Sequence, residues 1–350
     1  MKTRVITISD PDRQANDIME AAQLLRSGQV VAFPTETVYG LGANALDAQA
    51  VGKIFKAKGR PSDNPLIVHI HDISVWQQLV EDIPEKALLL ANKFWPGPLT
   101  MILKKSKLVP VEVTAGLDTV GVRMPAHPVA LKFIAMSGVP VAAPSANKSG
   151  RPSPTTARHV MEDMDGRIPM ILDGGPARVG VESTVLDMTG SVPVVLRPGG
   201  VTVEMLESAI GEVRIHPNVM KPVQKGDKVR SPGMKYVHYA PKAPVTLVRG
   251  ELNRQVEFIN KEAAKLENMG RKVGILATDQ TLFRYQAGIK LSMGNRENPA
   301  DIAGRLFARL REFDELNVDL ILAEGVEEKD EGLAVMNRMA RAAGFHIIDL

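Results

Sequence analysis

The segment Val139-Pro-Val-Ala-Ala-Pro-Ser-Ala-Asn-Lys-Ser-Gly150 joins a short apolar run to a polar loop. The apolar part predicts a buried strand. The loop that follows offers several hydroxyls, the Asn147 amide and the cations of Lys148 and Arg151. In α/β proteins, ligands commonly bind just past the carboxyl end of a strand. The loop can therefore hold a phosphate or a ribose, although each residue taken alone is an ordinary turn former.

Similar apolar runs surround this one in the N-terminal half and alternate with amphipathic helix patterns. One helix pattern runs from Asn16 to Arg26 and ends at Gly28, and another has Asp47 as its N-cap. The predicted strands are 30–33, 65–70, 99–103, 119–123, 139–143, 169–172, 183–187 and 192–197. Many strands with fewer helices predict an α/β or α+β domain with a large, twisted, mixed sheet.

Beyond residue 244 the pattern becomes a regular alternation of strands and helices. The predicted strands are 245–248, 273–277, 289–292, 320–323 and 346–348. The clearest helix has Asn298 as N-cap and Pro299 at its first position. This pattern predicts a small parallel sheet flanked by helices, Rossmann-like in class. It lacks the Gly-x-Gly-x-x-Gly turn, so dinucleotide binding is not supported.

The run between the two halves is rich in proline, glycine and lysine and has no sustained periodicity. We therefore expect a first domain over residues 1–212, a linker over 213–243 and a second domain over 244–350. Within the linker, Ser231-Pro-Gly-Met-Lys-Tyr-Val-His-Tyr-Ala-Pro241 is too specific in composition for a plain spacer.

The composition excludes several classes of protein. The chain has 350 residues and no cysteine, which rules out a disulfide scaffold, a cysteine nucleophile and a thiolate zinc site. A net charge of +3 suits an anionic small ligand as well as nucleic acid, but 4% aromatic residues argue against base stacking on RNA. The N-terminus lacks a signal sequence, and no stretch reaches the ~20 apolar residues of a membrane helix. We expect a soluble, cytoplasmic protein.

Cations gather at the end of one predicted helix, where Lys56, Lys58 and Arg60 follow one another closely. Taken alone, such a cluster is better explained by the helix dipole and the free carbonyls at a helix end. The alternative is that Lys58 and Arg60 clamp a polyphosphate, because arginine grips two oxygens through its planar fork and lysine adds a point charge.

Single polar residues in or beside the strands are further candidates: Thr35, Thr37, His69, Arg123, Ser183 and Arg197. A histidine within a strand, as His69 is, is more often a hydrogen-bonded structural residue than part of a site. Arg123 and Arg197 follow apolar runs, and burying an arginine is costly without an anionic partner. A carboxylate or phosphate ligand would supply that partner, and so would an internal Asp or Glu.

Six motifs in order resemble those of the YrdC-like family. They are Phe33-Pro-Thr-Glu-Thr-Val-Tyr-Gly-Leu-Gly42, Lys58-x-Arg60-Pro61 with Asn64-Pro65-Leu66, Trp95-Pro-Gly-Pro-Leu-Thr100, Gly121-Val-Arg-Met-Pro125, Pro144-Ser-Ala-Asn-x-Ser-Gly150 and Glu182-Ser-Thr-Val185. The linker and the Rossmann-like half resemble the longer, two-domain members. The resemblance thus implies a YrdC-like catalytic domain, a linker that acts as a lid, and a smaller Rossmann-like C-terminal domain.

The activity that this resemblance implies is that of a nucleotidyltransferase, an L-threonylcarbamoyladenylate synthase. Its substrates would be L-threonine, ATP and bicarbonate or CO2, and its products threonylcarbamoyl-AMP and pyrophosphate. This is the first step of threonylcarbamoyladenosine formation in tRNAs, and the product would pass to a tRNA threonylcarbamoyl transferase complex. Mg2+ would be carried by the ATP phosphates rather than by protein side chains. No organic cofactor, membrane or stable nucleic-acid complex is expected.

Individual residues also receive implied roles. Lys58 and Arg60 would be catalytic, because they would stabilise charge that grows on the phosphates. The residues implied to bind threonine are Thr37, His69, Arg123, Ala143 and Ser183, with Arg123 as the partner of its carboxylate. The residues implied to bind the nucleotide are Arg60, Asn64, Thr119, Ser145, Asn147, Ser153, Arg197 and, from the linker, Tyr236.

Two other interpretations stay open. A double-stranded RNA-binding module without catalysis would show RNA affinity with a steep salt dependence and no need for threonine. A nucleotide-binding regulatory protein would bind ATP without releasing pyrophosphate. The sequence has no P-loop, nucleophile elbow, HExxH or EF-hand motif, which suits an enzyme that works by positioning a nucleotide.

Overall fold

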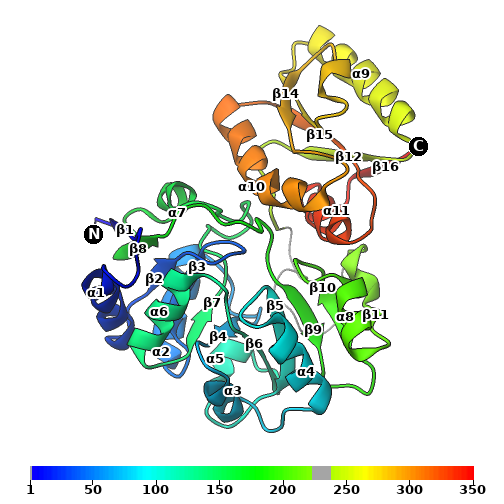
Figure 1. Cartoon of the computed structure of the whole chain (residues 1–350). Helices are drawn as coiled ribbons and strands as arrows, with labels where there is room; N and C mark the ends of the chain where they lie inside the picture. Colours follow the sequence, from blue (N-terminus) through cyan, green and yellow to red (C-terminus); the bar gives the residue numbers. More distant parts are fainter. Residues whose placement is uncertain (1, 223–237) are drawn as a thin grey trace. The chain divides into compact units, whose positions relative to one another are not determined.

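The computed structural model describes residues 2–222 and 238–350, which form two compact units (Figure 1). The second unit contains residues 238–350 and takes in two short segments from earlier in the chain, Gly150–Pro152 and Met220–Pro222. The first unit contains the rest of the described residues. A three-residue piece of the N-terminal half therefore belongs to the second unit.

A mixed sheet forms the centre of the first unit. Its strands are β1 (Arg4–Thr7), β2 (Val31–Phe33), β3 (Gly40–Asn44), β4 (Ile67–His69), β5 (Leu99–Lys104), β6 (Thr119–Arg123), β7 (Val141–Ala143), β8 (Met170–Asp173), β9 (Thr184–Asp187), β10 (Val194–Arg197) and β11 (Arg214–Ile215). Within the described residues the sheet has eleven strands in the order β1-β8-β2-β3-β7-β4-β6-β5-β9-β10-β11 (Figure 1). β4 runs parallel to β6 and antiparallel to β7. The predicted large mixed sheet is confirmed.

Helices cover both faces of the sheet. They are α1 (Ala15–Arg26), α2 (Ala48–Lys58), α3 (Ile73–Leu79), α4 (Glu85–Phe94), α5 (Val111–Thr114), α6 (Pro128–Ser137), α7 (Ala157–Met164), α8 (Val203–Ile210) and the 3-10 turn η1 (Pro217–Val219). The expected N-cap Asp47 accepts hydrogen bonds from the backbone N–H groups of Gln49 and Ala50. Gly28 follows α1 with a φ of 73°, a left-handed conformation that favours glycine.

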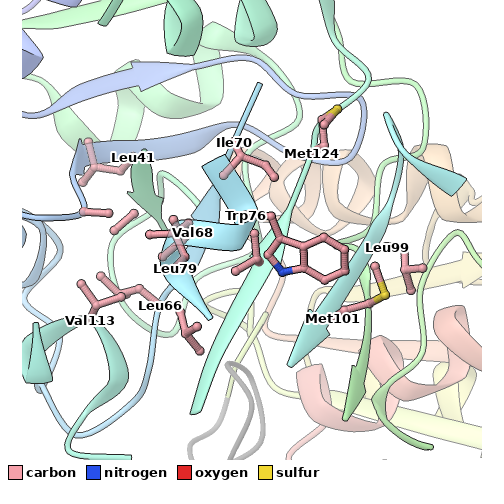
Figure 2. Packing of buried hydrophobic residues seen from close by; sticks show 14 of the residues in the cluster. Leu41, Leu66, Val68, Ile70, Trp76, Leu79, Leu99, Met101, Val113 and Met124 are labelled. Atoms are coloured by element: carbon pink, nitrogen blue, oxygen red, sulfur yellow. The ribbon is translucent and has the colours of Figure 1, made fainter. Parts of the chain in front are cut away.

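Strand β2 shows how the two faces are divided. Ala32 packs in the main hydrophobic cluster with residues of α2, α3, α4, α5, α7 and α8, and Figure 2 shows part of that cluster around Trp76. Val31 and Phe33 point to the opposite face and pack with α1 and α6. Since alternate side chains of a strand face opposite ways, the face of any residue in the sheet follows from its neighbours.

The second unit has a parallel sheet of its own. Its strands are β12 (Val245–Arg249), β13 (Val273–Ala277), β14 (Ile289–Ser292), β15 (Leu320–Glu324) and β16 (Ile347–Asp349), in the order β14-β13-β15-β12-β16. Each pairing among these strands is parallel. The other elements are α9 (Leu252–Asn268), η2 (Leu282–Arg284), α10 (Pro299–Leu316) and α11 (Glu331–Ala342). The predicted small parallel sheet with flanking helices is confirmed, and Asn298 caps α10.

Helix α10 holds the short segment that the second unit takes from the N-terminal half. Asp314 forms an ion pair with Arg151 at 3.1 Å. Arg311 donates a hydrogen bond to the carbonyl oxygen of Pro152 at 2.6 Å. Both contacts lie within the second unit, so they attach Gly150–Pro152 to the rest of that unit.

The segment that we expected to be a linker is described only in part. Its start, Arg214–Ile215, forms β11 and pairs in parallel with β10. Residues 223–237, which include Tyr236, lie outside the described residues. Among the helices of the described ranges, none has both the length and the apolarity needed to cross a membrane.

Candidate functional site

Predicted site residues share one face of β4 and β6. Val68 and Val122 belong to the main hydrophobic cluster, so His69 and Arg123 point to the opposite face. His69 and Arg123 are register partners on these parallel strands, which brings them side by side. Ala143, at the end of the neighbouring β7, faces the same way because it packs in the cluster with α1 and α6.

Arg123 is the centre of this group and is only 3% exposed. Its Nε donates to the carbonyl oxygen of Gly97 at 3.1 Å, and one terminal nitrogen donates to the hydroxyl of Thr37 at 2.9 Å. The other terminal nitrogen forms a buried ion pair with Glu36. Glu36 is thus the internal acidic partner that the sequence left open as an alternative to a ligand.

The segment that carries Glu36 is fixed by its two flanking threonines. The hydroxyls of Thr35 and Thr37 lie 2.8 Å apart, and Thr35 donates to the carbonyl oxygen of Val38 at 2.6 Å. Thr35, Glu36 and Thr37 are all buried. This connection between β2 and β3 therefore holds a preformed row of polar groups against Arg123.

His69 is kept neutral by its surroundings. Burial lowers the pKa of His69 to about 3, and the positive charge of Arg123 acts in the same direction. Nδ1 lies 3.2 Å from the carbonyl oxygen of Ile67, and the ring packs edge-on against Phe33 at 5.9 Å between centroids. His69 can therefore exchange hydrogen bonds with a ligand without adding a charge to the site.

A second group forms around Ser183, just before β9. Its hydroxyl lies 2.8 Å from that of Thr100, and Arg197 donates to its carbonyl oxygen from Nε at 3.1 Å and from a terminal nitrogen at 2.9 Å. The hydroxyl of Ser153 donates to the carboxylate of Glu182, the residue before Ser183. Three predicted site residues, Ser153, Ser183 and Arg197, thus form buried hydrogen bonds at the two neighbouring positions Glu182 and Ser183.

The loop after β7 forms a third group, and Lys58 holds it from the end of α2. The buried ammonium of Lys58 donates to the carbonyl oxygens of Ser145 and Asn147, the latter at 2.7 Å. The hydroxyl of Ser145 donates to the side-chain oxygen of Asn147 at 2.6 Å. A backbone bridge between Ser145 and Gly40 places this loop beside the segment that carries Thr37. The two predicted sets of binding residues are therefore neighbours.

Asn64 is the polar residue that most clearly indicates a ligand. Its side chain is fully buried, and within the described residues neither its amide oxygen nor its amide nitrogen has a hydrogen-bond partner. A buried polar group without a partner costs about 1–3 kcal/mol, so such groups are rare unless something completes them. The guanidinium of Arg60, four residues earlier, donates a hydrogen bond to the backbone carbonyl oxygen of Asn64 at 3.1 Å.

A small pocket begins at the residues directly after Asn64. Pro65 and Leu66 line it together with Thr119 and Gly121 of β6. The other lining residues are Ile67, Thr100, Ile102 and Val185. A side chain at Gly121 would crowd this pocket, because its Cβ would lie 3.2 Å from the methyl group of Thr100.

Sequence reasoning gave no role to Glu36, Thr100 or Glu182, although all three stand within the quoted motifs. The available signal was Glu36 itself, an acid between two threonines directly after an apolar strand. Its pairing with Arg123 joins residues 87 positions apart, which no local pattern reveals. Tyr236, predicted to bind the nucleotide, lies outside the described residues.

Known proteins resemble this chain over nearly its whole length. Residues 23–199 match the family of Sua5, YciO and YrdC, described as "Telomere recombination", and residues 201–344 match one described as "Threonylcarbamoyl-AMP synthase, C-terminal domain". The chain is similar to threonylcarbamoyl-AMP synthases of Pyrococcus abyssi (54% identical over 328 residues, 94% of each chain) and Bacillus subtilis (50% over 354 residues, 99% of this chain and 100% of the relative). A crystal structure of P. abyssi Sua5 complexed with L-threonine has a TM-score of 0.94 at 51% identity and covers 99% of this chain and 100% of that one.

Proposed function

The chain belongs to the threonylcarbamoyl-AMP synthase family, which makes it a nucleotidyltransferase-type enzyme, and we propose that it joins L-threonine, bicarbonate or CO2, and ATP into threonylcarbamoyl-AMP with release of pyrophosphate. One observation carries this proposal. The bridge between Gly40 and Ser145 sets the predicted phosphate loop beside the segment that holds Thr37 against Arg123. An amino-acid carboxylate and a nucleotide phosphate can therefore be held next to each other.

Threonine would bind through Arg123. The guanidinium has five N–H donors, and the described residues occupy three of them through Gly97, Thr37 and Glu36. Two donors remain for a carboxylate, whose charge-assisted hydrogen bonds are among the stronger polar contacts in proteins. Neutral His69, the hydroxyls of Thr37 and Ser183 and the backbone at Ala143 would surround the rest of the molecule.

The nucleotide would extend from the pocket to the loop. The amide of Asn64, which has no partner among the described residues, can exchange hydrogen bonds with adenosine, and the residues that line the neighbouring pocket, Thr119 and Gly121 among them, would lie against the base. The polar and cationic residues of the predicted nucleotide site would contact the ribose and phosphates: Arg60, Ser145, Asn147, Ser153 and Arg197. Tyr236 would reach over the nucleotide from the linker, which would act as a lid.

The reaction needs positioning and charge stabilisation more than a protein nucleophile. The threonine amine would attack CO2 and form a carbamate with loss of a proton, or attack bicarbonate and form the same carbamate with loss of water. A carbamate oxygen would then form a bond to the α-phosphorus of ATP while the bond to the leaving pyrophosphate breaks. Arg60 would stabilise the charge that grows on the phosphates, and Lys58 would act from behind the loop.

Magnesium would enter the reaction as part of the substrate. Within the described ranges no group of three or more acidic, histidine or cysteine side chains is placed to hold a metal ion. The nucleotide end of the site instead presents amide, hydroxyl and cationic groups, which suit phosphate oxygens better than a metal ion. We propose that Mg2+ arrives on the ATP phosphates.

The deciding experiment is pyrophosphate release from ATP and magnesium, with threonine and bicarbonate each omitted in turn. Release that requires both supports the proposed reaction. Release that ignores threonine would exclude it, and ATP binding with no release would favour a regulatory nucleotide-binding protein. Salt-dependent affinity for duplex RNA without any release would favour an RNA-binding module.

We further propose that a separate transferase complex uses the product to form threonylcarbamoyladenosine in tRNA.

A further inference from the structure

Glu36 has unused hydrogen-bonding capacity in the middle of the site. Its side chain is about 4% exposed, and one carboxylate oxygen is bound to Arg123 at 2.5 Å. Among the described residues the other oxygen, Oε2, has no hydrogen-bond partner. The backbone is anchored separately, because the carbonyl oxygen of Glu36 accepts a hydrogen bond from the N–H of Val179 at 2.7 Å.

A buried carboxylate oxygen without a partner is expensive, because the desolvation of a charged group is only partly offset by one ion pair. If Glu36 served only to neutralise Arg123, a geometry in which both carboxylate oxygens meet the guanidinium fork would be more stable. Within the described residues, the arrangement instead leaves one oxygen of Glu36 and two N–H donors of its ion-pair partner Arg123 without a hydrogen bond.

The free oxygen of Glu36 and the two remaining N–H donors of Arg123 complement a zwitterion. The ion pair is neutral overall, and burial keeps His69 uncharged beside it, so a ligand of net charge zero fits better than an anion. In a free α-amino acid the carboxylate and the ammonium are attached to the same carbon. Since Arg123 and Glu36 are in direct contact, a single α-carbon can present one group to each residue.

We propose that Oε2 of Glu36 accepts a hydrogen bond from the α-amino group of the bound amino acid, so that Glu36 is a specificity-determining residue of the threonine site. This inference rests on the proposed function and extends it. It assigns the selection for a free amine to Glu36, while Arg123 binds the carboxylate. Analogues that keep the carboxylate and the hydroxyl but lack the amine should lose the Glu36 contact.

The test compares two ligands by calorimetry without ATP: L-threonine and 3-hydroxybutanoate, which has hydrogen in place of the amine. The unaltered enzyme should prefer threonine by about ten- to hundredfold, the value of one charge-assisted hydrogen bond. Glu36→Gln should lose most of that preference, because threonine binds more weakly while 3-hydroxybutanoate changes little. Glu20→Gln, which removes an acid from an exposed ion pair with Arg4, is the matched control and should change neither affinity.

Two results would overturn the inference. Equal weakening of both ligands by Glu36→Gln would mean that Glu36 only holds Arg123 in place. Equal affinity of the unaltered enzyme for both ligands would mean that the amine is not recognised, and this comparison decides the matter even where the variant fails to fold. Absence of threonine binding in the unaltered enzyme, together with threonine-independent pyrophosphate release, would instead reject the proposed function itself.

Discussion

The ammonium nitrogen of Lys58 lies 2.7 Å from the carbonyl oxygen of Asn147, a residue 89 positions further along the chain. Lys58 is the last residue of α2, and Asn147 belongs to the loop after β7. The backbone N–H of Ser149 in turn donates to the carbonyl oxygen of Lys58 at 3.0 Å. The helix end and the loop are therefore tied together in both directions, and Lys58 both shapes the loop and places a positive charge behind it.

Replacing Lys58 with methionine keeps the apolar stem and removes the ammonium. Buried carbonyl oxygens in the loop lose their donor, so the free energy of unfolding should fall by about 2–3 kcal/mol. Pyrophosphate release should fall at least tenfold because the loop and its charge are both lost. Urea unfolding and a rate assay measure the two effects. A destabilised variant with an unchanged rate would restrict Lys58 to a structural role.

Arg60→Ala should lower the turnover number by about two orders of magnitude, as does the loss of other preorganised charge partners. Single-turnover pyrophosphate release at saturating ATP checks this. Arg60→Lys is the companion variant: it keeps the charge but not the planar fork, and it should recover only part of the rate. Unchanged turnover in Arg60→Ala would remove this residue from the mechanism.

Asn64→Ala should separate stability from nucleotide binding. The substitution removes a buried amide that has no partner among the described residues, so the ligand-free protein should be as stable as before or slightly more stable. ATP affinity should fall by about tenfold, the value of a lost hydrogen bond pair. Thermal unfolding with and without ATP measures both quantities. A large loss of stability without ATP would show that Asn64 is part of the scaffold instead.

Acid should weaken the fold through His69. The pKa of its side chain falls from 6.5 to about 3 on folding, chiefly through burial, so the unfolded chain binds the extra proton first. The stabilisation is complete above pH 6.5 and is lost as the pH falls through this window toward 3, by roughly 5 kcal/mol in all. Urea unfolding at a series of pH values should show a shallower decline for His69→Gln. An identical decline would assign the acid sensitivity to other groups.

The fold could be predicted where local pattern and burial agree. The strand Thr119–Arg123 has the predicted bounds because its apolar residues alternate with small or polar ones. β3 was missed, because Gly-Leu-Gly-Ala-Asn has low strand propensity. Tertiary packing explains it: a side chain on Gly42 would lie 2.7 Å from Val141 and 2.9 Å from the ring of Phe33, so glycine lets these strands approach.

The site was less accessible to sequence reasoning than the fold. The motifs located the segments that come together, but the residue roles came from a family resemblance and stay predictions. Contacts such as Arg123 with Glu36, or Lys58 with Asn147, join distant positions through the sheet. Only the three-dimensional arrangement shows which polar groups already form hydrogen bonds within the protein and which can still bind a ligand.

During translation, Gly150–Pro152 leave the ribosome long before helix α10 exists. The Arg151–Asp314 ion pair spans 163 positions, which at roughly 5–20 residues per second corresponds to a delay of about 8–30 s. The second unit can be completed only after both parts have emerged, because one piece of it is encoded in the middle of the first. Its assembly therefore waits until the C-terminal part of the chain has been made, and a gene split between the two units would separate residues that must later meet.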